Sequence, residues 1–174
     1  MNEASTDRLR RLVEAGIALS GELTLDGVLQ RIVETAASLT GARYAALGVI
    51  DTTGKGLERF VTSGIGDEQR ERIGAAPRGR GVLGLLISDA RPLRLHDIAG
   101  HSQSVGFPEH HPPMHTFLGV PILLRGVAYG NLYLCEKDGG GDFTAEDEDL
   151  VRMLAAQAAV AIENARLYEA QVRW

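Results

Sequence analysis

Residues 116–136 read TFLGVPILLRGVAYGNLYLCE, two apolar runs separated by the pair Arg125-Gly126. Runs of eight to ten residues rich in Val, Leu, Ile and Tyr are typical of strands. A two-residue connection that contains glycine is typical of a tight hairpin turn. We therefore predict an antiparallel hairpin with strands over 116–124 and 127–136.

Outward from this hairpin, the hydrophobic spacing predicts further strands, three longer helices and two short ones. The predicted strands cover 43–51, 57–63 and 92–95, and the helices cover 6–20, 24–40, 67–73, 81–88 and 144–169. Thr24 and Thr144 are good N-cap residues, and Gly41 is typical of a helix end. Helices before and after two hairpins indicate the α+β class, with helices packed on an antiparallel sheet.

Composition limits the function classes. The chain has 174 residues, 44% hydrophobic and 24% charged, which is typical of one globular domain. Its single cysteine, Cys135, excludes intramolecular disulfides and multi-cysteine metal sites. A net charge of −5 argues against nucleic acid or an anionic membrane as the main partner. No apolar run of about 18 residues and no signal peptide is present, so we expect a cytoplasmic protein without membrane insertion.

Two weaker motifs favour structural roles. Gly79, Gly81 and Gly84 match the spacing G-x-G-x-x-G, but neither a preceding strand nor an acidic residue about 20 positions later accompanies them. Tight turning at a helix start explains these glycines better than nucleotide binding. Nothing in the sequence assigns Cys135 a base that would activate it, so we expect a small packed residue there.

Histidines are concentrated in one irregular segment. His101, His110, His111 and His115 fall within fifteen residues, whereas the whole chain has five histidines. Two prolines follow His111 and stiffen the backbone beside apolar neighbours. A rigid imidazole at an apolar pocket suits a haem ligand. Zinc binding and an exposed histidine without a role are the alternatives that the residues leave open.

Several motifs resemble the GAF domain family over about residues 9–168, and more narrowly the first, haem-binding GAF domain of the gas-sensor histidine kinases DevS and DosT. They are LTGARYAAL at 39–47, PLRLHD at 92–97, SVGFP at 104–108, HPPM at 111–114, TFLGVP at 116–121, GNLYL at 130–134 and ENARLY at 163–168. This resemblance implies a central antiparallel sheet with the terminal helices on one face. A ligand pocket made of loops and short helices is implied on the other face.

The same resemblance implies residue roles. His111 would be the proximal ligand of the haem iron, and Tyr133 would lie on the distal side. The Tyr133 hydroxyl could then donate a hydrogen bond to bound dioxygen, and not usefully to carbon monoxide. Phe60, Phe107 and Met114 would line the pocket. From pattern alone, Tyr133 is a core tyrosine of a central strand.

The implied function is a bacterial sensory domain that binds b-type haem. It would detect O2, NO, CO or redox state for a two-component histidine kinase, whose catalytic domain this chain lacks, so we expect no enzyme activity. The GAF-type methionine sulfoxide reductases need several cysteines. The resemblance further implies a homodimer through the terminal helices, with 1–23 as N-terminal helix and linker, 24–168 as the sensor domain, and 169–174 leading toward an output domain.

Two positions depart from the haem-binding relatives. His115 stands where arginine is common, and Gly48 stands where one of the two sensors has a carboxylate near the haem edge. Both positions bear on haem access and redox behaviour, so oxygen sensing and redox sensing remain alternatives. A haem-free GAF module that binds another small ligand, or that acts in dimerisation and signal relay, is the second hypothesis.

Overall fold

The computed structural model describes residues 3–22, 24–50, 57–64, 91–97 and 114–172. Its helices are α1 (Glu3–Ser20), α2 (Leu25–Thr40) and α5 (Ala145–Val172), and its strands are β1 (Ala42–Ile50), β2 (Leu57–Ser63), β3 (Leu93–Leu95), β4 (Phe117–Leu124) and β5 (Val127–Lys137). Every element predicted within these ranges is confirmed, with bounds that differ by at most three residues. The helices predicted over 67–73 and 81–88 lie outside the described residues.

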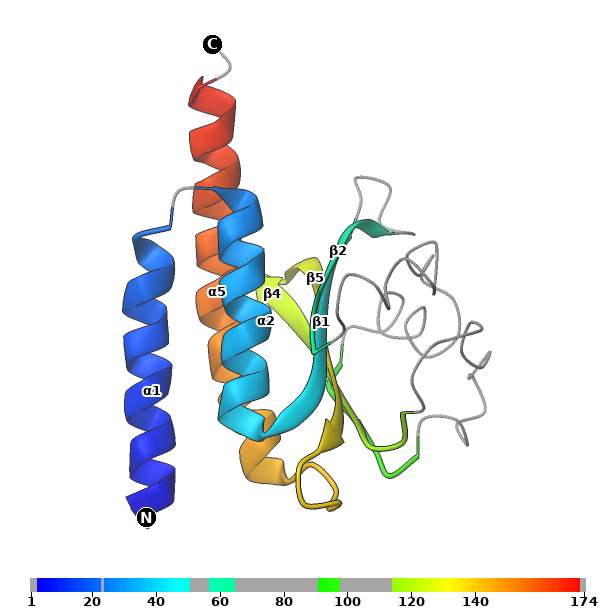
Figure 1. Ribbon diagram of the computed structural model, residues 1–174. Coiled ribbons are helices and arrows are strands. Elements are labelled where there is room, and N and C mark those ends of the chain that lie inside the picture. The colour runs from blue at the N-terminus through cyan, green and yellow to red at the C-terminus, as the bar shows by residue number, and fades with distance from the viewer. Residues whose placement is uncertain (1–2, 23, 51–56, 65–90, 98–113, 173–174) are drawn as a thin grey trace.

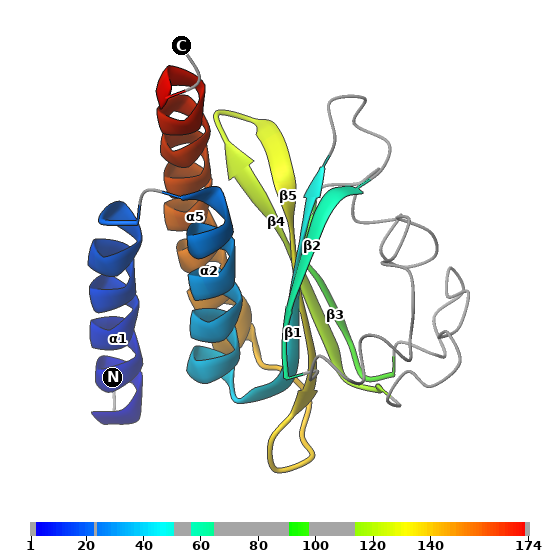
Figure 2. The same ribbon diagram turned by 45° about the horizontal axis from the view of Figure 1, so that its top comes forward.

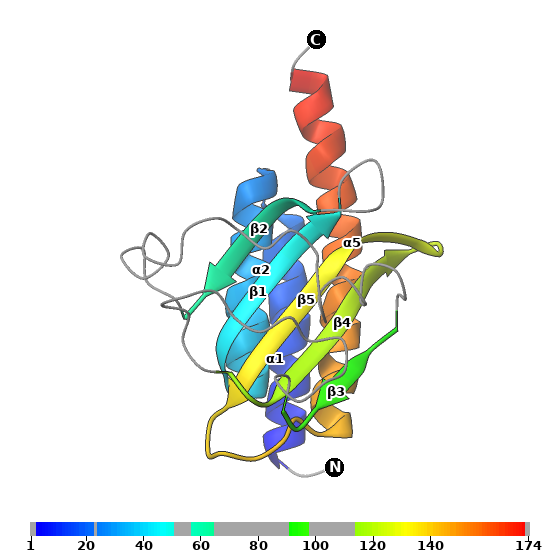
Figure 3. The same ribbon diagram turned by 90° about the vertical axis from the view of Figure 1, so that its right-hand side faces the viewer.

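The strands form one antiparallel sheet in the order β2-β1-β5-β4-β3. Strand β5 is therefore the central strand, as Figure 3 shows. The hairpin from β4 to β5 turns at Arg125 and Gly126, whose φ angles are 52° and 78°. Two successive positive φ angles indicate a type I′ turn, whose twist matches that of the flanking strands. The turn predicted from Arg125-Gly126 is thus confirmed.

The helices form two layers on one face of the sheet (Figures 1 and 2). Helices α2 and α5 lie side by side against the strands, and α1 packs on both of them from outside. The expected α+β architecture, with the terminal helices on one face, is confirmed. Among the described helices, none combines the length and the apolar character that crossing a membrane requires.

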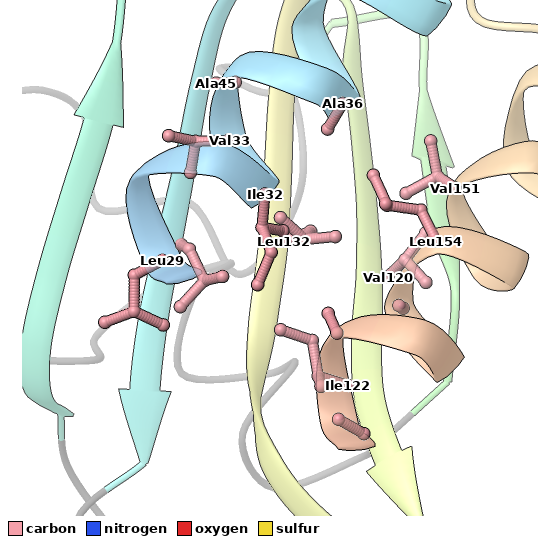
Figure 4. Close-up of a cluster of buried hydrophobic side chains, with 14 of the residues drawn as sticks. Leu29, Ile32, Val33, Ala36, Ala45, Val120, Ile122, Leu132, Val151 and Leu154 are labelled. Carbon is pink, nitrogen blue, oxygen red and sulfur yellow. The ribbon is translucent and has the colours of Figure 1, made fainter. Parts of the chain in front are cut away.

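Aliphatic side chains fill the space between this helix layer and the sheet (Figure 4). They include Leu29, Ile32, Val33 and Ala36 of α2, Ala45 of β1, Val120 and Ile122 of β4, Leu132 of β5, and Val151 and Leu154 of α5. Burying each large aliphatic side chain stabilises the fold by about 1.5–3 kcal/mol. The apolar stripes of the two helices therefore explain why they cover this face.

Local hydrogen bonds set the helix ends. Thr24 has extended backbone angles, and its side chain accepts a hydrogen bond from the Gly27 N–H at 3.1 Å. Gly41, in the left-handed region at φ 74°, donates its N–H to the Ala37 carbonyl at the other end of α2. Thr144 and Asp147 form a reciprocal capping box at the start of α5. All three predicted caps are confirmed.

Candidate functional site

The face of the sheet turned away from the helices carries a second cluster of buried side chains. Its members are Met114, Phe117, Tyr133 and Cys135, with Tyr44, Ala46, Phe60, Leu93 and Leu95 partly buried around them. Because side chains alternate along a strand, Gly48, Thr62, Gly119, Pro121 and Asn131 belong to the same face. We call this the site face. It is the face on which the resemblance places the ligand pocket.

Tyr133 lies at the centre of the site face. Its ring stands between those of Phe60 and Phe117, with both centroid distances at 6.3 Å. Its cross-strand partners are Ala46 on β1 and Gly119 on β4. These small residues leave the phenol flanked by aromatic rings on the diagonals and by little side-chain bulk directly opposite. The described part of the site face therefore forms an apolar floor with one phenol in its middle.

Burial keeps the Tyr133 phenol in its neutral form. Its side chain is only 4% exposed. Desolvation raises the pKa of Tyr133 far above its usual value of 10, and the neighbouring Asn131 lowers that pKa only in part. Tyr133 thus keeps its hydroxyl proton at every physiological pH and can donate a hydrogen bond.

Polar atoms on the site face are buried without partners among the described residues. They are the hydroxyl oxygens of Tyr133 and Thr62 and both polar atoms of the Asn131 carboxamide. A buried polar group without a hydrogen bond costs about 1–3 kcal/mol. Such groups are uncommon in native structures, and an ordered water or a ligand is a usual explanation. Because these donors and acceptors lie at the centre of an apolar floor, this face is the candidate binding surface.

The structure brings together three of the five predicted site residues. Phe60 and Tyr133 are in ring contact, and Met114 packs in the same cluster. Phe107 and His111 lie outside the described residues, as do His101 and His110. His115, which differs from the arginine common in the haem-binding relatives, is exposed, and its Nδ1 lies 3.5 Å from an Asp97 carboxylate oxygen.

Glu136 holds the chain just after the segment that carries His111. Its carboxylate accepts hydrogen bonds from the backbone N–H groups of His115 and Thr116, the latter at 3.2 Å. Glu136 itself has a φ of 57°, in the left-handed region that non-glycine residues seldom adopt. The Thr116 hydroxyl accepts in turn from the Lys137 N–H at 3.2 Å. These bonds fix Met114 and the start of β4 against the end of β5.

A shallow groove at the same end of the sheet is lined by His96, Asp97, His115, Thr116, Glu136, Lys137 and Gly140. His96 forms a hydrogen bond through Nδ1 to Asp142 at 2.7 Å, and this bond raises the pKa of His96. Within the described ranges, no group of three or more histidine, cysteine or acidic side chains could hold a metal ion. The zinc alternative for His110 and His111 is not tested, because both residues lie outside those ranges.

Cys135 is a packed thiol at the edge of the same cluster. Burial, and to a smaller extent the negative charge of Glu136, raises the pKa of Cys135 to about 12. A thiol with such a pKa is almost entirely protonated near pH 7, and the protonated form is a weak nucleophile.

Asp147 connects the central strand to the terminal helices. Its side chain is fully buried and accepts hydrogen bonds from Lys137 at 2.5 Å, from Arg8 at 2.6 Å and from the Thr144 N–H at 2.9 Å. Burial alone would raise the pKa of Asp147, but the bonds from Lys137, Thr144 and Arg8 outweigh it and hold that pKa below its usual value. One carboxylate thereby links the end of β5, the start of α5 and the outer helix α1.

Sequence reasoning missed several of these groups. Asn131 and Thr62 were not singled out, because isolated amides and hydroxyls in strands have no motif. Their two-residue spacing from Tyr133 and Phe60 is the signal that could have found them. The sequence predicted Asp147 as the capping partner of Thr144, and the acidic first turn of α5 as a favourable charge near the helix N-terminus. Nothing in the sequence indicated that Asp147 is buried between two cations.

Known proteins share this fold and, in part, this sequence. The GAF domain of a phosphoenolpyruvate-protein phosphotransferase from Coxiella burnetii superposes with a TM-score of 0.82 at 24% identity, covering 97% of this chain and 99% of that one. The second GAF domain of DevS from Mycobacterium smegmatis superposes with a TM-score of 0.62 at 24% identity, covering 86% and 98%. At these identities the two likenesses show the fold.

A curated relative is the probable 3′,5′-cyclic phosphodiesterase pde-5 of Caenorhabditis elegans. It is 25% identical over 162 residues, and the match covers 84% of this chain and 21% of that protein, so the chain spans about a fifth of its length. The family model described as the GAF domain matches residues 22–163, which include all five strands and α2. The chain therefore belongs to the GAF domain family, whose members are sensory and regulatory modules of signalling proteins.

Proposed function

We propose that this chain is a sensory domain that binds b-type haem against the site face, with His111 as the proximal ligand of the iron. It would detect O2, NO, CO or redox state for a two-component histidine kinase. The observation that carries the proposal is the Tyr133 hydroxyl, which is buried among aromatic rings and lacks a partner among the described residues. A neutral donor in an apolar site suits a small ligand with partial negative charge.

The described residues fit a flat, largely apolar cofactor. Phe60, Phe117 and Met114 supply an apolar surface, and Ala46 and Gly119 add little bulk beside Tyr133. When bound, haem supplies an iron that can hold a diatomic gas or change its oxidation state. The chain contributes exclusion of water by the apolar floor and a hydrogen bond from Tyr133. Glu136 holds the backbone of His115 and Thr116 at the start of β4.

The route of the signal follows β5. Tyr133 and Cys135 face the site, and Lys137 at the end of the same strand donates to the buried Asp147. Asp147 also caps α5 and pairs with Arg8 of α1. A displacement of β5 on ligand binding would change the geometry of this carboxylate and so reach both terminal helices.

The terminal helices also present an apolar surface suited to a second copy of this chain. Met153, Val160 and Leu167 recur at seven-residue spacing along α5 and are exposed. Val13 and Ile17 of α1 are exposed as well, and α1 packs on α5 near Gly16 and Gln157. Seven-residue spacing of apolar positions is typical of paired helices. We propose that this surface forms a homodimer, which would carry the signal onward along α5.

Absorption spectroscopy tests the haem assignment directly. Protein expressed with haem available should show a Soret band with about one haem per chain. His111→Ala should lose that band, and the matched control His115→Ala, at an exposed position two residues after the tandem prolines, should keep it. Absence of the band in the unaltered chain contradicts the proposal and favours the haem-free module. A band unchanged in position and stoichiometry in His111→Ala rejects His111 as the ligand.

A further inference from the structure

The site face buries the carboxamide of Asn131 without a partner among the described residues. The Asn131 side chain is 1% exposed, and neither its Nδ2 nor its Oδ1 forms a hydrogen bond with them. The residues directly opposite are Gly48 on β1 and Pro121 on β4, whose side chains offer no polar atom. Because a buried amide without hydrogen bonds costs free energy, packing alone does not account for an asparagine at this position.

Asn131 is one of three polar side chains that flank β1 on the site face. Asn131 and Tyr133 are two positions apart on β5, so they share this face, and their partners on β1 are Gly48 and Ala46. On the other side of β1, the register places Thr62 of β2 opposite Ala46 (Figure 3). Each of the three polar side chains has a buried polar atom without a described partner. Unsatisfied groups from two strands therefore surround one strip of small residues.

The chemistry of the carboxamide limits the ligand group that it can contact. It offers two N–H donors and one acceptor oxygen and carries no charge. Its neighbours Gly48, Pro121 and Tyr133 supply no positive charge either. A carboxylate such as a haem propionate would be buried there without a cation, which is strongly unfavourable. A small uncharged group with partial negative charge suits this position, because a neutral donor is most effective in apolar surroundings.

We propose that Asn131 is a second ligand-contacting residue of the site face: its carboxamide donates a hydrogen bond directly to the diatomic ligand, alongside Tyr133. This assignment rests on the proposed function. It adds two requirements of its own. The carboxamide must lack a partner in the ligand-free chain, and its effect on ligand preference must add to that of Tyr133. Each requirement has a separate measurement.

Thermal unfolding of the haem-free chain tests the first requirement. Asn131→Leu replaces the amide with an apolar side chain of similar shape, so the midpoint should rise by about 2–4 °C when an unsatisfied group is removed. Thr116→Val is the matched control, because the buried Thr116 hydroxyl accepts a hydrogen bond from the Lys137 N–H at 3.2 Å. Its midpoint should fall by about 2–4 °C.

A fall in the midpoint of Asn131→Leu, like that of Thr116→Val, would mean that the carboxamide is already bonded within the chain, and would overturn the proposal without any haem measurement. If the leucine side chain prevents folding, Asn131→Val replaces it, since valine is smaller and suits a strand. The same rise and fall of the midpoints are then expected.

The O2 and CO dissociation constants of the haem-bound chain test the second requirement. Asn131→Leu should lower the preference for O2 over CO by about 3- to 10-fold, the contribution of one modest hydrogen bond. Combined with Tyr133→Phe, it should lower that preference further than either single variant does, because two donors contact the ligand separately. Asn131→Thr, which keeps a hydroxyl donor, should restore part of the preference.

The outcomes distinguish this proposal from the proposed function. Absence of a Soret band in the unaltered chain would reject the function and this contact together. A Soret band with an unchanged ratio of O2 to CO affinity in Asn131→Leu would reject the contact alone. A loss in the double variant equal to that of Tyr133→Phe would mean that Asn131 acts only through Tyr133, which also overturns a direct contact.

Discussion

The two faces of the sheet are built from the same strands but bury different kinds of side chain. On β5, Leu132 and Leu134 point to the helices and have no exposed surface, and the neighbouring Asn131 and Tyr133 point to the site face. The core cluster on the helix side of the sheet consists of hydrophobic side chains, whereas the site face buries polar atoms of Asn131, Tyr133 and Thr62 that lack described partners. Alternation along one strand therefore separates the side chains of the hydrophobic core from those of the proposed ligand-binding face.

The largest expected effect is on the helix side. Leu132→Ala should lower the free energy of unfolding by about 2–5 kcal/mol, because it leaves a cavity between β5 and α2. The adjacent Tyr133→Phe should change that free energy by less than about 1 kcal/mol, since the hydroxyl forms no hydrogen bond with a described residue. Urea denaturation followed by circular dichroism measures both. Equal losses in the two variants would contradict the division between the faces.

Beyond the two faces, the apolar surface on the outer helices should respond to charge. Val160→Glu places like charges opposite each other in a two-fold interface, so the dimer should weaken by about 100-fold, equivalent to about 3 kcal/mol. Analytical ultracentrifugation over a range of concentrations measures this change. Val127→Glu, an equally apolar and exposed position on the β4–β5 hairpin, is the control and should leave association unchanged. Dissociation caused equally by both variants would reject the terminal helices as the interface.

The buried Asp147 carboxylate, which links β5 to helices α5 and α1, should have a smaller, pH-dependent effect on stability. Asp147→Asn should cost about 1–3 kcal/mol, because the Lys137 and Arg8 side chains are partly exposed and can regain water. The folded pKa of Asp147 is lowered, so its stabilisation is present above its unfolded value near 3.8 and is lost as pH falls through the lower folded value.

Denaturation at a series of pH values checks this expectation. The stability difference between the unaltered chain and Asp147→Asn should be constant above about pH 5 and should shrink below about pH 4. Asp149→Asn, two residues away and exposed, should show no such dependence. A difference that grew toward low pH would mean that the Asp147 carboxylate is destabilising.

On the site face, Tyr133→Phe should have the smallest effect on stability and should change the selectivity between O2 and CO. Tyr133→Phe in the haem-bound chain should weaken O2 binding by about tenfold, equivalent to about 1.4 kcal/mol, and leave CO binding nearly unchanged. Flash photolysis and equilibrium titration provide both constants. Parallel losses for the two gases would mean that Tyr133 only shapes the pocket and does not donate to the ligand.

Most of the fold could be predicted from the sequence. The turn at Arg125-Gly126, the caps at Thr24 and Thr144, and the apolar stripes of the helices are local signals, and in natural sequences such signals agree with the overall fold. The candidate site was predicted only in part. Resemblance predicted Tyr133, Phe60 and Met114. Alternation along β5 places Asn131 on the same face as Tyr133, but nothing in the sequence indicated that its carboxamide is buried without a partner among the described residues.

The sequence by itself determined the elements, their ends and the pairing of the hairpins, because these depend on spacings of two to four residues and on the backbone preferences of glycine and threonine. Only the tertiary structure decided which side chains meet. Phe60, Phe117 and Tyr133 come together from three strands, and Arg8 reaches Asp147 across 139 positions. Such contacts arise when distant segments pack around a shared core, and no short spacing in the chain encodes them.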